Sequence, residues 1–229
     1  QERLCPIVTT KHEIITDSGG PGKYRGGCGT EKGGILTKVK DTVMSYCCDR
    51  SRSVTWGLFG GLPSYPHGAW LNPGKENEQF LGAIFSNVKI REGDSFTRPS
   101  AGGGGLGDPL ERAPEAVLED VIDGYVSIAR AEKDYGVVIR EIDKELDQYE
   151  IDYEATQKAR EFIRKNRKQW LQEDMDKVMD MYKKGEIDQL DLIRRYGVII
   201  DMQTGEVLRK TTQQFREMLQ RRAAAYWTE

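Results

Sequence analysis

A single arginine stands in the densest glycine segment of the sequence, where its side chain could bind an anion. Residues 17–27 read DSGGPGKYRGG, so Arg25 is followed directly by Gly26 and Gly27. A planar guanidinium on a loop of unusual backbone geometry can make paired hydrogen bonds to a carboxylate or a phosphate. The same side chain could equally clamp the loop to a neighbouring acidic residue. Arg25, Gly26 and Gly27 are therefore candidate substrate- or phosphate-facing residues.

A second glycine run, residues 102–107 (GGGGLG), contains the G-x-G-x-x-G spacing of dinucleotide-binding turns. Such a turn normally opens directly into a helix, whereas Asp108 and Pro109 follow this one and no regular β-α-β pattern surrounds it. A Rossmann site is therefore not expected. Runs of backbone amides can still cradle anions, so Gly103, Gly104 and Asp108 are further phosphate-facing candidates.

The Gly-Lys pairs at residues 22–23 and 74–75 resemble the end of a nucleotide-binding P-loop, but neither is followed by Ser or Thr. We therefore do not expect this chain to bind ATP in that way. The two histidines, His12 and His67, stand on unrelated segments, and no Cys-x-x-Cys spacing occurs, so no metal ligands are assigned. His67 lies in a loop and is the better functional candidate, although a lone histidine is more often structural.

The bulk composition is ordinary for a soluble protein. The chain has 229 residues and a formal net charge of −3, and no apolar run is long enough to span a bilayer. We expect a cytoplasmic protein with neither nucleic acid nor membrane as a partner. Four cysteines are too few for a disulfide scaffold and are expected to be reduced and mostly buried. Because Gln1 is not a methionine, we expect a longer gene product.

The elements that must position these residues fall into two halves, which together predict an α+β fold. Most glycines precede Asp108, and long stretches of helix-forming residues follow it. We expect residues 1–108 to be a β-rich portion of a catalytic domain with glycine-rich loops. We expect residues 109–229 to be a mainly helical region that contacts other subunits. Strands are expected at 5–16, 35–39, 42–48, 84–91 and 95–98, and helices at 114–122, at 127–134 and within 152–184.

The helical half contains an internal repeat. Residues 135–139 (YGVVI) resemble residues 196–200 (YGVII), and residues 155–162 (ATQKAREF) resemble residues 211–218 (TTQQFREM). Each copy indicates Tyr-Gly, an apolar strand, a turn and a helix, which we interpret as one supersecondary unit used twice.

Several ordered motifs resemble those of the hydantoinase B/oxoprolinase family. Residues 17–27 resemble its D-S-G-G-x-G-[RK]-[YF]-R-G-G signature, and residues 49–52 (DRSR) and 56–61 (WGLFGG) resemble its D-R and W-G-x-x-G-G segments. Residues 102–112 (GGGGLGDPLER) are similar to its closing motif, G-G-G-G-x-G-D-P-x-x-R. The fixed order of these motifs makes the resemblance more specific than any single motif would.

This resemblance implies that the chain is the carboxy-terminal part of a large catalytic subunit whose other part is absent here. It implies a hydantoinase A-type partner subunit that binds ATP and phosphorylates a carbonyl or enolate oxygen of a small-molecule substrate. A divalent metal, where family members hold one, would lie in the absent amino-terminal region.

The B-type subunit would then hydrolyse a cyclic amide (hydantoin, oxoproline or lactam) or carboxylate a ketone. We place hydrolysis slightly first, since most members resemble those enzymes. The segment from about Asn166 onward is more like the extended subunits of acetone and acetophenone carboxylases. A third interpretation is a non-catalytic assembly module of such a complex.

Overall fold

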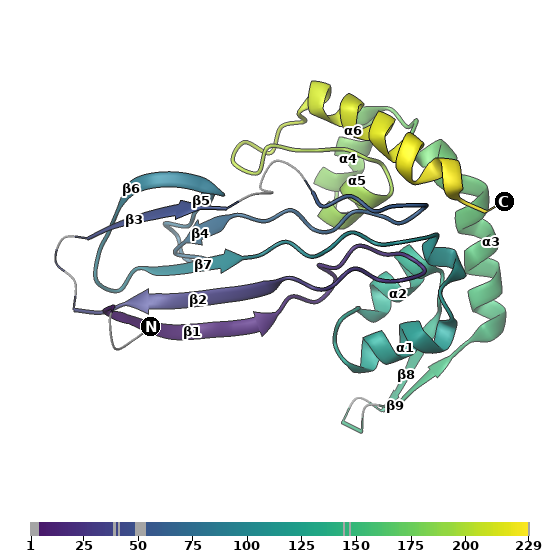
Figure 1. Cartoon of the computed structure of the whole chain (residues 1–229), viewed down its shortest axis with the longest axis horizontal. Coiled ribbons are helices and arrows are strands. Elements are labelled where there is room, and N and C mark those ends of the chain that lie inside the picture. The colour runs from purple at the N-terminus through teal and green to yellow at the C-terminus, as the bar shows by residue number, and fades with distance from the viewer. Residues whose placement is uncertain are drawn as a thin grey trace.

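The computed structural model describes residues 5–38, 40, 42–48, 54–143, 145–146 and 148–228. Strands occupy the first half and helices most of the second, which confirms the α+β class. Figure 1 shows the sheet at one end of the molecule, the helices at the other, and extended segments running between them. Among the described residues, no helix is both long and apolar enough to cross a membrane.

The main sheet has five antiparallel strands in the order β1-β2-β7-β4-β5. Their bounds are Ile7–Ile14, Thr30–Leu36, Ser95–Pro99, Ala69–Leu71 and Gln79–Gly82. A separate ribbon pairs β3 (Thr42–Cys47) with β6 (Ile84–Ile90). A small core, in which Leu36, Leu71 and Ile90 are buried and Phe96 packs against them, joins the ribbon to the sheet.

The strands expected at 5–16, 42–48, 84–91 and 95–98 are confirmed, whereas β2 differs from the expectation. It begins at Thr30 rather than residue 35 because Gly33 and Gly34, which have low strand propensity, lie inside it. A Cβ on Gly34 would approach Ile7 Cγ2 to 2.7 Å, so close packing of β1 explains this glycine. The short strands β4 and β5 were not anticipated.

The second half contains six α-helices among its described residues, two 3₁₀ turns and one hairpin. The α-helices are α1 Pro114–Ile122, α2 Ile128–Tyr135, α3 Tyr153–Trp170, α4 Met175–Lys183, α5 Gln189–Arg194 and α6 Arg209–Arg222. The 3₁₀ turns are η1 Pro109–Glu111 and η2 Ala224–Tyr226, and the hairpin pairs β8 Ile139–Asp143 with β9 Gln148–Ile151.

The helical stretch expected within 152–184 is two helices, because Asp174 begins a new one. Its side chain accepts hydrogen bonds from the amides of Asp176 and Lys177, as an N-cap does. Asp152 caps α3 in the same way, through the amide of Ala155.

The internal repeat is confirmed in atomic detail. In the first copy, the Nε of Arg160 donates to the carbonyl of Tyr135 at 3.2 Å. In the second copy, Arg216 Nε donates to the carbonyl of Tyr196 at 2.9 Å. The glycine that follows each tyrosine is left-handed, with φ of 63° and 60°.

A threonine of the last helix also binds the extended segment in both copies. Thr156 Oγ1 accepts from the amide of Val138, and Thr212 Oγ1 accepts from the amide of Ile199, each at 3.0 Å. Two helices precede the Tyr-Gly pair in each copy, α1 and α2 in the first and α4 and α5 in the second. The similarity of residues 135–162 to residues 196–218 did not reveal these helices. The turns after α1 and α4 match as well, because Gly124 and Gly185 both have φ of 75°.

The strand expected in each copy is only partly present. In the first copy, residues 137–138 lie ahead of the sheet and β8 begins at Ile139. In the second copy, the strand is reduced to an isolated bridge between Ile200 and Val207. The amides ahead of these positions bind threonine rather than a neighbouring strand, which explains the shortening.

Candidate functional site

The glycine-rich stretches that are separate in the sequence lie side by side in the structure. Three extended segments, residues 18–29, 56–62 and 102–107, are joined by backbone hydrogen bonds, and we call them the glycine bundle. The amide of Gly20 donates to the carbonyl of Gly103 at 2.8 Å, and the amide of Gly105 donates to the carbonyl of Leu62 at 3.0 Å. These segments run from the sheet to the helices in Figure 1.

Most bundle glycines are needed because backbone meets backbone there. A Cβ on Gly104 would lie 2.0 Å from the carbonyl oxygen of Trp56, and one on Gly26 would lie 2.1 Å from that of Gly103. No larger residue fits such an approach. The candidates Gly26 and Gly104 therefore have a structural function, and a substitution there would disturb folding before it tested chemistry.

Gly27 differs from its neighbours. A Cβ placed on it would meet no atom within 4 Å, and the residue is exposed. Its amide makes no backbone hydrogen bond within the described part of the chain, whereas its carbonyl accepts from Gly103 at 2.8 Å. A free amide beside open space is the feature expected of an anion-binding loop.

Arg25 is held by an acidic residue of the helical half. Its Nε lies 3.1 Å from Asp120 Oδ1, and its guanidinium lies 4.8 Å from the centroid of the Tyr125 ring. Arg112 Nη2 binds the other oxygen of Asp120 at 2.8 Å. This geometry agrees with the alternative in which Arg25 clamps the loop to an acidic residue. Anion binding by Arg25 stays a prediction.

Asp108 fastens the end of the bundle to α3 and to residue Thr228. It binds Arg167 through two hydrogen bonds of 2.7 and 2.8 Å, and it accepts from the amides of Leu110 and Thr228 at 3.0 and 3.1 Å. Burial alone would raise the pKa of Asp108, but the hydrogen bonds and charge of Arg167 outweigh it and hold this pKa below its ordinary value. The carboxylate is thus ionised and fully engaged.

Arg194 is a buried residue of the site that sequence reasoning missed. Its Nη2 donates to the carbonyls of Asp17 and Gly19 at 2.7 and 2.9 Å, and its Nε donates to that of Pro63 at 3.1 Å. Its Nη1 binds Asp134 at 2.7 Å. Because most of its partners lie more than a hundred residues away, no local pattern in the sequence could have revealed this role.

His67 lies on the sheet side of the bundle and is buried. Its Nε2 is 3.0 Å from Cys48 Sγ, just beyond the end of β3. Burial and a hydrogen bond with Cys48 raise the pKa of Tyr46 to about 12. The structure therefore places His67 in a thiol–phenol cluster with Cys48 and Tyr46.

The cysteines and possible metal ligands are also placed by the structure. All four cysteines are free, but the expectation that they are mostly buried is wrong: Cys5 and Cys47 are exposed, and Cys28 and Cys48 are only partly buried. In the part of the chain that the structure describes, no group of three or more His, Cys, Asp or Glu side chains could hold a metal ion.

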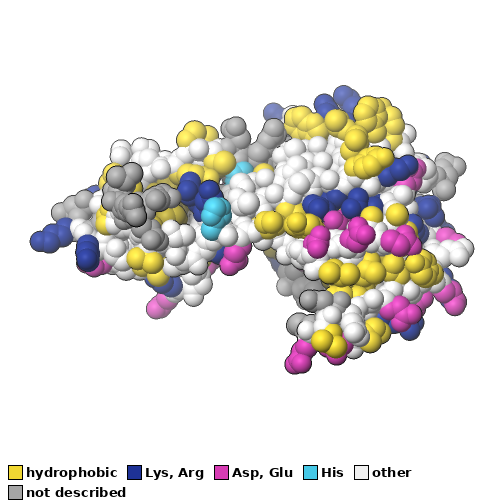
Figure 2. All heavy atoms as spheres, turned by 60° about the horizontal axis from the view of Figure 1, so that its bottom comes forward, with side chains coloured by type: hydrophobic (Ala, Val, Ile, Leu, Met, Phe, Trp, Pro, Cys, Tyr) yellow, Lys and Arg dark blue, Asp and Glu magenta, His cyan; other side chains and the backbone are white. Residues whose placement is uncertain are grey.

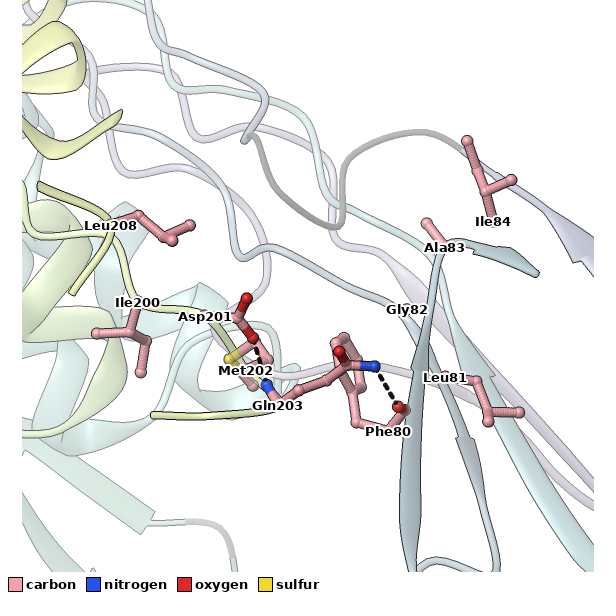
Figure 3. A pocket seen from close by; sticks show the side chains of 10 residues that line it. All are labelled: Phe80, Leu81, Gly82, Ala83, Ile84, Ile200, Asp201, Met202, Gln203 and Leu208. Carbon is pink, nitrogen blue, oxygen red and sulfur yellow. Dashed lines mark hydrogen bonds between the residues drawn. The ribbon is translucent and has the colours of Figure 1, made fainter. Parts of the chain in front are cut away.

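A cavity of about 380 Å³ lies between the sheet and the second copy of the repeat. Figure 3 shows its lining from the β5–β6 region on one side and residues 200–208 on the other. Gln203 Nε2 donates to the carbonyl of Phe80 at 3.1 Å across it. The charged residue in its lining is Asp201, whose carboxylate already accepts from the amide of Gln203 at 2.8 Å.

The family model for hydantoinase B/oxoprolinase matches residues 1–109 of this chain. Its D-R motif at residues 49–52 lies outside the described residues. The acetone carboxylase alpha subunit of Xanthobacter autotrophicus is 31% identical over 76% of this chain and 27% of its own length. The B-type subunit of a putative D-/L-hydantoinase from a Pseudomonas species is 31% identical over 69% of this chain and 26% of its own length. The chain thus spans about a quarter of these relatives.

Solved structures of two enzymes are similar to this chain. A nucleotide-free acetone carboxylase covers 94% of it with a TM-score of 0.62 and 25% identity, and the match takes up 31% of that chain. An ATP-dependent caprolactamase from Pseudomonas jessenii covers 70% with a TM-score of 0.57 and 31% identity, over 27% of its own length.

Proposed function

Because this chain belongs to the hydantoinase B/oxoprolinase family, we propose that it is part of the catalytic subunit of an ATP-dependent enzyme. The substrate would be a small carbonyl compound that is activated by phosphorylation on oxygen. A hydantoinase A-type partner would bind the ATP, and the rest of the large subunit would complete the site. We place ketone carboxylation first among the possible reactions.

The observation that carries this order is the second copy of the repeat. The acetone carboxylase structure covers 94% of this chain and the caprolactamase structure 70%. The difference is about a quarter of the chain, which is the size of the segment from α4 to η2. The larger coverage by the acetone carboxylase structure, by about the size of this second copy, supports the same reaction here. Sequence reasoning placed hydrolysis first, and this coverage reverses the preference.

Hydrolysis of a cyclic amide is the second candidate. Sequence identity favours it, since this chain is 31% identical to the caprolactamase structure over the matched residues and 25% identical to the acetone carboxylase structure. In both reactions the chemistry of this chain would be the same in kind. Preorganised amides of the glycine bundle would face the oxyanion or phosphate of the activated substrate. Gly27, with an amide free of backbone partners and open space beside it, is the best-placed of these candidates.

The reaction is tested by ATP turnover in the assembled enzyme that contains this chain. We expect acetone or acetophenone, together with bicarbonate, to stimulate turnover more than a hydantoin, 5-oxoproline or caprolactam does. Stimulation by cyclic amides alone would assign the chain to the hydrolases. Turnover that responds to neither class would remove the enzymatic proposal.

A pair of variants distinguishes an anion-binding site in the glycine bundle from a role in subunit assembly alone. Gly27→Ala adds a methyl group to open space and should leave folding and assembly intact while lowering turnover at least ~10-fold. Glu76→Ala is the control, because Glu76 is an exposed residue of the turn between β4 and β5 and lies outside the three segments of the bundle. Unchanged turnover in Gly27→Ala would favour the assembly module.

A further inference from the structure

Three basic residues form a row across the main sheet. On β1, β2 and β7, His12 is paired with Lys32, and Lys32 is paired with Arg98. Directly paired residues of antiparallel strands point to the same face with Cβ atoms ~5 Å apart, so the row is about 10 Å long. Figure 2 shows histidine beside Lys or Arg side chains on the lobe that carries the sheet.

This basic row lies on the face of the sheet that the β3–β6 ribbon covers. Arg98 and Lys32 are two residues from Phe96 and Gly34, which are paired with each other, and Phe96 packs into the small core beneath the ribbon. Side chains alternate along a strand, so all of these residues share one face. The row therefore continues from an apolar core onto uncovered sheet.

No carboxylate neutralises the row among the described residues. The acidic neighbours Glu13 and Glu31 bind Lys11 at 3.6 and 2.5 Å on the opposite face of the sheet. Like charges placed directly opposite each other destabilise a sheet unless an anion accompanies them. Two permanent positive charges beside an imidazole match a dianion.

An apolar cavity adjoins the row. It has a volume of about 340 Å³, and its lining includes Leu36, Tyr46, Phe85 and Ile90. A smaller hollow of about 140 Å³ is lined by the whole row and, at the irregularity in β1, by Lys11 as well. The two hollows share Ile7, Phe96 and Arg98, so the apolar cavity meets the cations at Arg98. A pocket of this size with a few convergent polar groups suits a small ligand.

We propose that this face binds a small organic phosphate, with the phosphate on the row His12–Lys32–Arg98 and the apolar body in the adjoining cavity. The phosphate monoester supplies the dianion that the row lacks, and Arg98 contacts both parts of the ligand because it lines both hollows.

Phenyl phosphate is a suitable probe, and calorimetric titration of the chain at fixed ionic strength is the test. We expect saturable 1:1 binding, with phenol and inorganic phosphate each bound at least ~10-fold more weakly. Lys32→Gln and Arg98→Gln should each weaken binding of phenyl phosphate ~10-fold, the loss expected for one charge-assisted hydrogen bond. Lys89→Gln is the control, since Lys89 is an exposed lysine on β6 outside both linings.

Three results would overturn the proposal: no saturable binding, equal affinity for phenyl phosphate and inorganic phosphate, or an equal loss in the Lys32 and Lys89 variants. The last would mean long-range attraction without a site. Should the half-buried Arg98 prove necessary for folding, Lys32→Gln alone decides. Lys32 is exposed and makes no ion pair among the described residues, so its removal leaves the fold intact.

Discussion

Breaking the ion pair between Asp108 and Arg167 should be one of the most destabilising single changes in this chain. Both residues are buried, with exposures of 2% and 5%, and two parallel hydrogen bonds of 2.7 and 2.8 Å join them. Asp108→Asn keeps the shape of the side chain but removes its charge and one acceptor, so a buried guanidinium is left unpaired. Breaking a buried pair in this way costs about 3–5 kcal/mol.

Chemical denaturation followed by circular dichroism measures this loss, and thermal unfolding should show a melting temperature lower by about 10 °C. Asp176→Asn is the matched control. Asp176 pairs with Arg209, but these side chains are 69% and 63% exposed, so its removal should cost less than about 1 kcal/mol. Equal stability losses in the two variants would refute the reasoning, because burial would then have no effect on the energy of the pair.

The same pair predicts a pH dependence. The pKa of Asp108 is depressed in the folded chain, so its contribution is complete above the unfolded pKa of about 3.9 and is lost as the pH falls through the folded value. Wild type and Asp108→Asn should therefore converge in stability as the pH is lowered below about 4. A difference that stays constant down to pH 2 would contradict this assignment.

Two further outcomes are expected from the helical half. Gly136→Ala should destabilise the chain more than Gly124→Ala in denaturant titrations: both glycines are left-handed, but only the Cβ at 136 would meet Arg160 Cγ, at 2.7 Å. The reverse order would mean that the contact relaxes freely. Arg194→Lys should lose about 3 kcal/mol, because one ammonium cannot bind the carbonyls and the carboxylate that the guanidinium bridges. Amide hydrogen exchange should then increase first in the segment around Gly19, and uniform loss of protection would count against a local role.

Local patterns predicted a large part of the fold. The strand at Thr42–Cys47 and the helix Pro114–Ile122 end close to where residue preferences place them, since turns and a leading proline mark their limits. The start of β2 was predicted wrongly because the glycines inside it do not favour a strand in the sequence. Close packing of the neighbouring strand requires these glycines. Tertiary packing, which a single sequence does not display, determined that position.

The candidate site was predictable in composition but not in function. Glycine density indicated close approach, and the structure shows that the partner of most of these glycines is other backbone. Sequence reasoning alone could not separate Gly27 from Gly26, because adjacent identical residues differ here only in what surrounds them. Arg194 was missed for the opposite reason: a charged residue on a short helix has no unusual local pattern.

The glycine bundle explains why the helical half is needed. Glycine loses more conformational entropy on folding than any other residue and brings no side chain to bury, so a bundle of glycine segments cannot stabilise itself through a hydrophobic core. Buried arginines supply that stability from the helical side: Arg167 reaches the bundle through Asp108, and Arg194 through the carbonyls of Asp17 and Gly19. Arg25 is held in turn by Asp120 of α1. The anion-binding role proposed for Gly27 would depend on this support, since amides can be preorganised for an anion only where the surrounding structure holds a costly backbone in place.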